Sequence, residues 1–221
     1  MTAPVFLLRG RIDGIGRAEV ARYLRYGKAQ PTGADADLID SVIHEVEAVL
    51  DCRACWTRVP LTPLGSSPPA PSSSSLRSVP FACGPLELRS PILLRHIAGC
   101  TQAIVFVATA GLGIDRLLAT YQRTSPARAL VMQAAGAAAV EAWCEQLCAS
   151  WAAAMATEGF ATRVRFSPGY GQWPLEEGQR GIFGWLEPSR HIGVSLTDGC
   201  LMIPTKSVSA LVGLAPQPAT E

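Results

Sequence analysis

The stretch QAIVFVATAGLGIDRLLATYQRTSPARALVMQAAGAAAVEAWCEQLCASWAAAMATEGFATRVRF, residues 102–166, determines most of the fold. Its first eight residues (102–109) are apolar and rich in β-branched side chains, which predicts a buried strand. The Ser-Pro pair before the Ala-rich run is a typical helix start, and it predicts one long helix over residues 126–157. The segment FATRVRF at 160–166 predicts a further strand.

The rest of the chain adds elements of both kinds. We expect helices over 16–26, 35–50 and 174–186 and one from Ser90-Pro91 onward, strands over 56–61 and 79–88, and two or three short strands between Val194 and Leu214. Since no regular βαβ repeat is present, the predicted class is α+β: a mixed, mainly antiparallel twisted sheet flanked by helices, in a single domain over 1–221. The Pro/Ser-rich segment 62–78 is expected to be a flexible insertion, and 215–221 a loose tail.

Composition excludes several classes of protein. The 221 residues are 48% apolar and 17% charged, with a net charge of +1. Such a chain is too apolar for disorder and lacks the basic surface of a nucleic-acid-binding protein. No apolar run is long enough to span a membrane. The N-terminus has no basic segment before its short apolar run, so we expect no signal peptide and a cytoplasmic protein.

The seven cysteines are odd in number and scattered, which is not typical of a disulfide framework. Cys52 and Cys55 form a Cys-x-x-Cys pair with two interpretations, half of a zinc or redox site or two buried reduced thiols. A zinc site needs a second close pair, and Cys83 and Cys100 are far apart in the sequence. We therefore favour buried thiols and expect no metal.

Two further patterns begin like functional motifs and then depart from them. Gly111-Leu112-Gly113 starts like a dinucleotide-binding turn, but Arg116 stands where the third glycine belongs, which favours a plain strand-to-helix turn. The three histidines share no ligand spacing, and no triad motif surrounds a serine. We therefore expect no catalytic side chain of the hydrolase or metalloenzyme type.

Residues 165–171, Arg-Phe-Ser-Pro-Gly-Tyr-Gly, differ from core sequence. Pro168 lacks an N–H donor, and the two glycines allow a positive φ or a close approach of the backbone to a ligand. Arg165 carries a planar set of donors suited to a carboxylate or phosphate, and Tyr170 offers a ring and a hydroxyl. The residues alone leave two interpretations open: a pocket for a small anion or zwitterion, or a structural turn with a surface arginine.

These residues belong to a longer pattern. Arg165, Gly169 and Tyr170 match Arg-x-x-x-Gly-Tyr, and LTDGCLMIPTKSVSA at 196–210 matches Leu-Thr-(Glu/Asp)…Pro…Ser-Val-Ser-(Gly/Ala). In these motifs the chain resembles the activation domain of cobalamin-dependent methionine synthase, in its short, free-standing form. Upstream, the predicted long helix resembles the long helix of that family, in which a glutamate faces the pocket, and Glu141 stands at the matching position.

The resemblance implies that the chain binds S-adenosylmethionine. It implies six ligand-binding residues, Glu141, Arg165, Ser167, Pro168, Gly169 and Tyr170. Arg165 would pair with the ligand's carboxylate, and Glu141 with its ammonium group or a ribose hydroxyl. The backbone of the turn, that of Ser167 included, would lie against the ligand, with Tyr170 closing one side.

The implied function is reactivation of a partner methionine synthase. The chain would present S-adenosylmethionine for the reductive methylation of cob(II)alamin, with an electron from a flavodoxin-like or other reductant. It has no Asp-x-His-x-x-Gly motif, so cobalamin is expected on the partner chain, a methionine synthase or another corrinoid protein. We expect no nucleic-acid or membrane partner.

Two other functional interpretations stay open. One is a non-catalytic partner or scaffold protein of a corrinoid-dependent methyltransferase that has lost S-adenosylmethionine turnover. The other is an independent methyltransferase that uses S-adenosylmethionine to modify a small molecule. Transfer of a labelled methyl group separates these interpretations, because the label reaches cobalamin in reactivation, stays untransferred with a scaffold protein and reaches a small molecule with an independent methyltransferase.

Overall fold

The apolar segment at the start of the opening stretch forms β5 (Gln102–Thr109), an interior strand of the main sheet in a computed structural model of the protein. The structure describes residues 3–27, 29–64 and 79–217. β5 pairs along its length with β2 (Cys52–Pro63) on one side and β9 (Ser207–Pro216) on the other. All its side chains after the first are buried, because helices cover both faces of the sheet, and this explains the absence of polar alternation.

The other strands are short. They are β1 (Phe6–Gly10), β3 (Phe81–Cys83), β4 (Leu86–Leu88), β6 (Phe160–Thr162), β7 (Ser195–Leu196) and β8 (Met202–Ile203). In the described residues the main sheet has the order β4-β3-β2-β5-β9-β6, with β1 also paired to β2, and every ladder is antiparallel. β7 and β8 form a separate two-stranded ladder.

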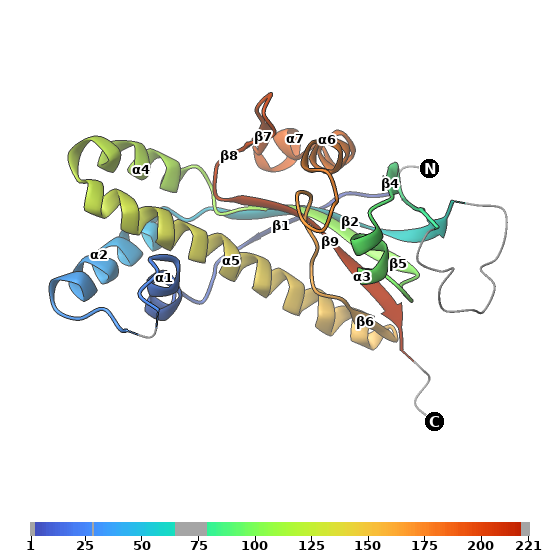
Figure 1. Ribbon diagram of the computed structural model, residues 1–221, viewed down its shortest axis with the longest axis horizontal. Coiled ribbons are helices and arrows are strands. Elements are labelled where there is room, and N and C mark those ends of the chain that lie inside the picture. The colour runs from blue at the N-terminus through green and yellow to red at the C-terminus, as the bar shows by residue number, and fades with distance from the viewer. Residues whose placement is uncertain (1–2, 28, 65–78, 218–221) are drawn as a thin grey trace.

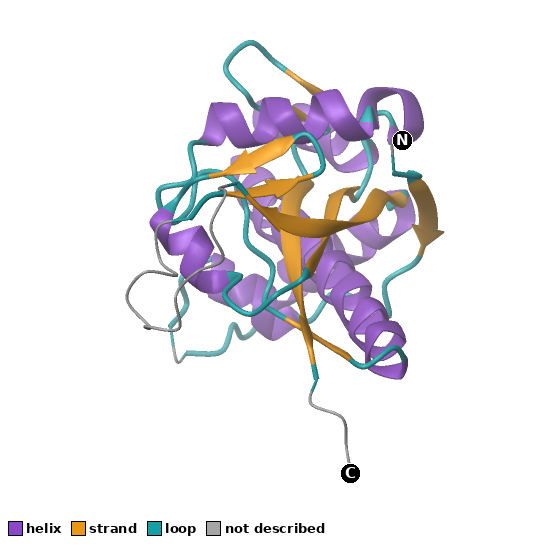
Figure 2. Ribbon diagram, turned by 90° about the vertical axis from the view of Figure 1, so that its right-hand side faces the viewer, coloured by secondary structure: helices purple, strands orange, loops and turns teal. Residues whose placement is uncertain are grey.

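Helices lie on both faces of the main sheet. They are α1 (Arg17–Tyr23), α2 (Ala34–Val49), α3 (Pro91–His96), α4 (Gly113–Thr124), α5 (Pro126–Thr157), α6 (Leu175–Leu186) and α7 (Pro188–Ile192). The apolar side chains of α1, α2, α4 and α5 form one buried cluster with one face, and those of α3, α6 and α7 form a second cluster with the other. Figure 1 shows α5 and α6 on opposite sides of the strands, and Figure 2 views the same layers after a quarter turn. Both clusters share one sheet, so the described residues form one domain.

None of the helices in the described residues is long and apolar enough to cross a membrane. The longest, α5, has 32 residues, but its mean hydropathy is lowered by the polar side chains at 133, 141 and 145. It lies instead against the sheet, with a row of small and apolar side chains in the first cluster.

The predicted α+β class, with a mainly antiparallel sheet flanked by helices, is confirmed. The strand predicted at 56–61 is too short, because residues 52–55 of β2 pair with β1 and, from Arg53 on, with β5, and the other end of β2 continues to β3. The strand predicted at 160–166 is too long, since β6 ends at Thr162 and, after one hydrogen bond from Arg163, only Phe166 still pairs with β9, through an isolated bridge. Both errors come from pairing between segments far apart in the sequence, which a local pattern does not contain.

The ends of two segments that were predicted to be irregular belong to the sheet. Residues 62–63, the start of the predicted insertion, pair with β3, and residues 215–216, the start of the predicted tail, pair with β6. The remaining core of the insertion, 65–78, and the last residues, 218–221, lie outside the described residues.

The glycines at 111 and 113 have a structural role. Gly111 has a φ of +93°, and a Cβ on Gly113 would lie 2.6 Å from the carbonyl oxygen of Val49 at the end of α2. The two glycines therefore let the chain turn out of β5 and start α4 in close contact with α2. This agrees with the plain strand-to-helix turn favoured from the sequence.

The Cys-x-x-Cys pair lies in β2, and its two thiols are on opposite faces of the sheet. Cys52 belongs to the cluster under α5, and Cys55 to the cluster under α6, as the alternation of side chains along a strand requires. The two sulfurs are therefore unable to bind one metal ion together. Among the described residues, no group of three His, Cys, Asp or Glu side chains is placed to hold a metal.

Both thiols should be chemically inert in the folded protein. Burial raises the pKa of Cys52 to about 11 and that of Cys55 to about 12, so neither forms an appreciable amount of thiolate at pH 8. We expect iodoacetamide at pH 8 to leave both unmodified in the native protein and to modify both after unfolding in guanidinium chloride, as measured by peptide mass spectrometry. Rapid modification of either thiol in the native protein would contradict this arrangement.

Candidate functional site

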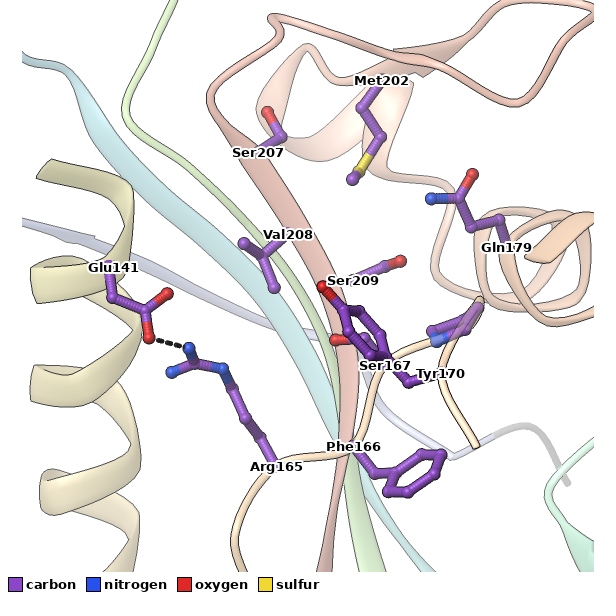
Figure 3. Close-up of a pocket in the computed structure, with 11 residues that line it drawn as sticks. Glu141, Arg165, Phe166, Ser167, Tyr170, Gln179, Met202, Ser207, Val208 and Ser209 are labelled. Carbon is purple, nitrogen blue, oxygen red and sulfur yellow. Dashed lines mark hydrogen bonds and ion pairs between the residues drawn. The ribbon is translucent and has the colours of Figure 1, made fainter. Parts of the chain in front are cut away.

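A cavity of about 560 Å³ opens between α5 and α6, along the edge of β9. Figure 3 shows Glu141 on α5 and Gln179 on α6 facing it from opposite sides, with β9 between them. Its lining comes from four segments of the chain: Glu141; Arg165, Phe166, Ser167, Pro168 and Tyr170; Gln179; and Met202, Ser207, Val208 and Ser209.

The cavity exists because the outer edge of β9 is only partly paired. β6 pairs with residues 214–216, and Phe166 forms a single bridge to Leu211, with N–O distances of 2.8 and 2.9 Å. In an antiparallel strand the backbone groups of every second residue point to the same edge, so the N–H and C=O of Ser209 point where those of Leu211 do. Within the described residues no strand covers that edge at Ser209, which leaves a donor and an acceptor at the cavity wall.

Arg165 points toward α5 because of the residue that follows it. Phe166 packs against the cluster under α6, so the preceding side chain lies on the other face of the sheet. There the guanidinium of Arg165 donates to a carboxylate oxygen of Glu141 (Figure 3). Their side chains are 21% and 29% exposed, so the pair is largely removed from water but still accessible from the cavity.

Arg165 stays charged in this partly buried site. Burial alone would lower its pKa, but the hydrogen bond with Glu141, followed by the charge interactions with Cys144, Glu141 and Cys148, leaves the pKa above its ordinary value. A guanidinium has five N–H donors, and the contact with Glu141 Oε1 uses one of them. Further donors are therefore available to an anionic group in the cavity.

The turn after Arg165 is closed by its own backbone. The N–H of Gly169 donates to the carbonyl of Trp173 at 2.8 Å, and the N–H of Trp173 donates to the carbonyl of Tyr170 at 2.9 Å. Gly169 and Gly171 have φ values of +90° and +52°, which explains the need for glycine at both positions. The turn leaves Tyr170 71% exposed at the mouth of the cavity.

The structure brings together most of the residues predicted from the sequence. Five of the six line the cavity, namely Glu141, Arg165, Ser167, Pro168 and Tyr170. Gly169 does not line it, and a Cβ there would lie 3.3 Å from Leu175 Cδ1, so its role in the described residues is to shape the turn. Contact of these six residues with a ligand stays a prediction.

Several lining residues were not among the predicted site residues. Ser207 and Ser209 lie in the Ser-Val-Ser segment, and their spacing of two could have indicated a shared face of a strand. Gln179 and Met202 carry no motif, and they reach the cavity only because α6 and β8 fold over β9.

Hydrogen bonds hold the start of β9 in place. The carboxylate of Asp115 accepts from the backbone N–H of Thr205 at 2.8 Å, and Ser207 donates its hydroxyl to the carbonyl of Pro204 at 2.7 Å. Lys206 extends along α5, where its ammonium donates to the carbonyl of Gln133 at 3.2 Å. These contacts fix the turn between β8 and β9, and with it the part of the cavity wall formed by Met202 and Ser207.

The fold and cavity define an antiparallel α+β domain with a ligand-sized site at a free strand edge. The family model for the vitamin B12 dependent methionine synthase activation domain matches residues 96–219, which contain the turn, α6 and β9. The chain belongs to this family.

A solved structure supports the same fold. The chain is similar to the crystal structure of the MetH reactivation domain bound to AdoHcy, with a TM-score of 0.66 and 17% sequence identity over 100% of this chain and 82% of that one. At this identity the likeness concerns the fold. No curated protein matches the chain.

The distance between the turn and α6 depends on a glycine. A Cβ on Gly178 would lie 2.8 Å from Pro168 Cβ and Cγ and from Trp173 Cε2, whereas a Cβ on Gly184 of the same helix would meet no atom within 4 Å. We expect Gly178→Ala to destabilise the protein by about 1–3 kcal/mol through overpacking. The control Gly184→Ala should be neutral or stabilise by up to about 1 kcal/mol. Equal effects of the two substitutions in denaturant unfolding would contradict this account.

Proposed function

We propose that the chain binds S-adenosylmethionine in this cavity and presents its methyl group for the reductive methylation of cob(II)alamin on a partner methionine synthase. The observation that carries the proposal is the convergence of the family's motif residues from α5, the turn after β6 and β9 on one cavity. The cavity volume of about 560 Å³ lies in the range typical of sites for small molecules.

The charged wall matches the amino-acid end of the ligand. Arg165 donates to the carboxylate through N–H groups not used by Glu141, and Glu141 accepts from the ammonium group. Each ligand charge then meets an opposite charge in a site shielded from bulk water, where such hydrogen bonds are strong. AdoHcy, which is bound in the similar MetH structure, has this same amino-acid end, and this supports the assignment.

The remaining walls suit the rest of the ligand. The backbone N–H and C=O of Ser209 offer a donor and an acceptor at the cavity wall formed by β9, and the ring of Tyr170 covers the mouth of the cavity. Pro168 is buried against α6 and gives the turn a flat surface that needs no hydrogen bond. The ligand is thereby held from several sides, which fixes the orientation of its bond between sulfur and the methyl group relative to the protein.

The chemistry requires positioning rather than a catalytic side chain from this chain. Cobalamin held by the partner supplies the metal that accepts the methyl group, after one electron from a flavodoxin-like or other reductant. The methyl group leaves sulfur without its bonding electron pair, so AdoHcy is released and no proton is transferred. The contribution of this chain is to hold the ligand in line and to limit the access of water. We expect it to act in the cytoplasm, with no nucleic acid or membrane as partner.

Arg165→Ala should weaken the binding of S-adenosylmethionine. Loss of charge-assisted hydrogen bonds to the carboxylate is expected to raise Kd about 10- to 100-fold in isothermal titration calorimetry. Arg163→Ala is the matched control, because Arg163 is exposed in the same segment and is not among the residues that line the cavity. An unchanged Kd for Arg165→Ala, in a protein whose circular dichroism spectrum is native, would contradict the assignment of Arg165.

Methyl transfer tests the proposed reaction itself. With a methionine synthase that lacks its own activation domain, a reducing system and methyl-labelled S-adenosylmethionine, the wild-type chain should transfer label to cobalamin. The Arg165→Ala variant should transfer it more slowly at subsaturating ligand. A stable complex without label transfer would support a scaffold protein instead, and label on a small molecule without any partner would support an independent methyltransferase.

A further inference from the structure

Gln179 is a buried polar side chain that the functional assignment leaves unexplained. It lies on α6, is 5% exposed and lines the cavity on the side opposite Glu141 (Figure 3). Its Oε1 is buried and has no hydrogen-bond partner among the described residues. Buried polar groups in native proteins are nearly always hydrogen-bonded, so an unpaired one at a cavity wall points to a ligand.

The backbone beneath Gln179 holds it in this orientation. A Cβ on Gly178 would clash with Pro168 and Trp173, and a Cβ on Gly181 would lie 2.5 Å from Leu86 Cδ2, so the helix face next to Gln179 packs closely against the turn and β4. The next residue, Arg180, donates to the carbonyl of Asp198 at 2.9 Å and ties the helix to the β7–β8 ladder. The position of the carboxamide therefore follows from helix packing rather than from a contact of its own.

We propose that Gln179 recognises the amino edge of the adenine base and so determines the specificity of the site for an adenosyl ligand. This inference rests on the proposed function, which assigns the amino-acid end of the ligand to the Arg165–Glu141 side of the cavity. The nucleoside end then extends across β9 toward α6, where Gln179 lies.

The chemistry of a carboxamide fits this edge. Adenine has an amino group that donates and an adjacent ring nitrogen that accepts, and a glutamine side chain has an acceptor and a donor at the same spacing. In the structure the amide nitrogen of Gln179 faces the cavity and Oε1 is turned away from it (Figure 3). Rotation about the last side-chain bond brings Oε1 to the amino group as acceptor, with Nε2 as donor to the ring nitrogen. A base without the amino group leaves Oε1 buried and unpaired, and sites of this type discriminate strongly against such analogues.

The experiment compares two ligands on each variant. The probes are S-adenosylhomocysteine and its analogue with unsubstituted purine in place of adenine, which lacks the 6-amino group. By calorimetry the wild-type chain should bind the adenine compound about tenfold or more tightly. Gln179→Met, which has similar shape and no carboxamide, should bind both with nearly equal affinity. Gln122→Met, on an exposed position of α4, is the matched control and should keep the wild-type preference.

The outcomes separate this inference from the proposed function. If the wild-type chain binds both probes equally, or if Gln179→Met keeps the preference, Gln179 does not read the base, while binding of S-adenosylhomocysteine still supports the proposed function. If the wild-type chain binds neither probe, the proposed function and this inference are both wrong. The comparison within the wild-type chain requires no variant, so it remains decisive even if Gln179→Met fails to fold.

Discussion

The backbone pairing of Phe166 with Leu211 is the interaction on which the site depends. Its two hydrogen bonds are the last that join the segment after β6 to β9, beyond the bond from Arg163 N–H to the carbonyl of Gly213, and they leave the edge at Ser209 open. Because side chains alternate along an extended chain, the same bridge directs Phe166 into the cluster under α6 and Arg165 toward α5. One local contact thus produces both the open edge that forms the floor of the cavity and the charged wall beside it.

Close packing then fixes the opposite wall. Gly178 allows Pro168 and Trp173 to approach the axis of α6, and Gly171 allows Phe166 and Ile92 to approach the turn, since a Cβ there would lie 2.5 and 2.8 Å from their side chains. Interiors packed at this density change position in discrete steps rather than gradually. The packing of the turn against α6 and α3 therefore holds this wall of the cavity in place without a ligand.

The sequence predicted what local patterns encode. β5 and α5 were predicted correctly because an apolar, β-branched run and a long Ala-rich run are each recognisable from the local sequence alone. The extent of β2 was missed because it depends on pairing with β1 and β3, which are distant from it in the sequence. In the site, the turn after Arg165 was predicted from its unusual local sequence, and Glu141 was predicted from the family resemblance. Gln179 was not predicted, because only the packing of α6 brings it to the cavity.

The Arg165–Glu141 pair also bears on selectivity through charge. Without a ligand the two side chains neutralise each other, so neither leaves an uncompensated charge in a partly buried site. On the proposed function, a zwitterionic amino-acid group adds one opposite charge to each partner, and every charge remains paired. A simple carboxylic acid would satisfy Arg165 but place a second negative charge beside Glu141, with no cation to offset it. On the proposed function, repulsion by Glu141 would therefore favour an amino acid over a simple acid, whereas an arginine without Glu141 would bind both equally well.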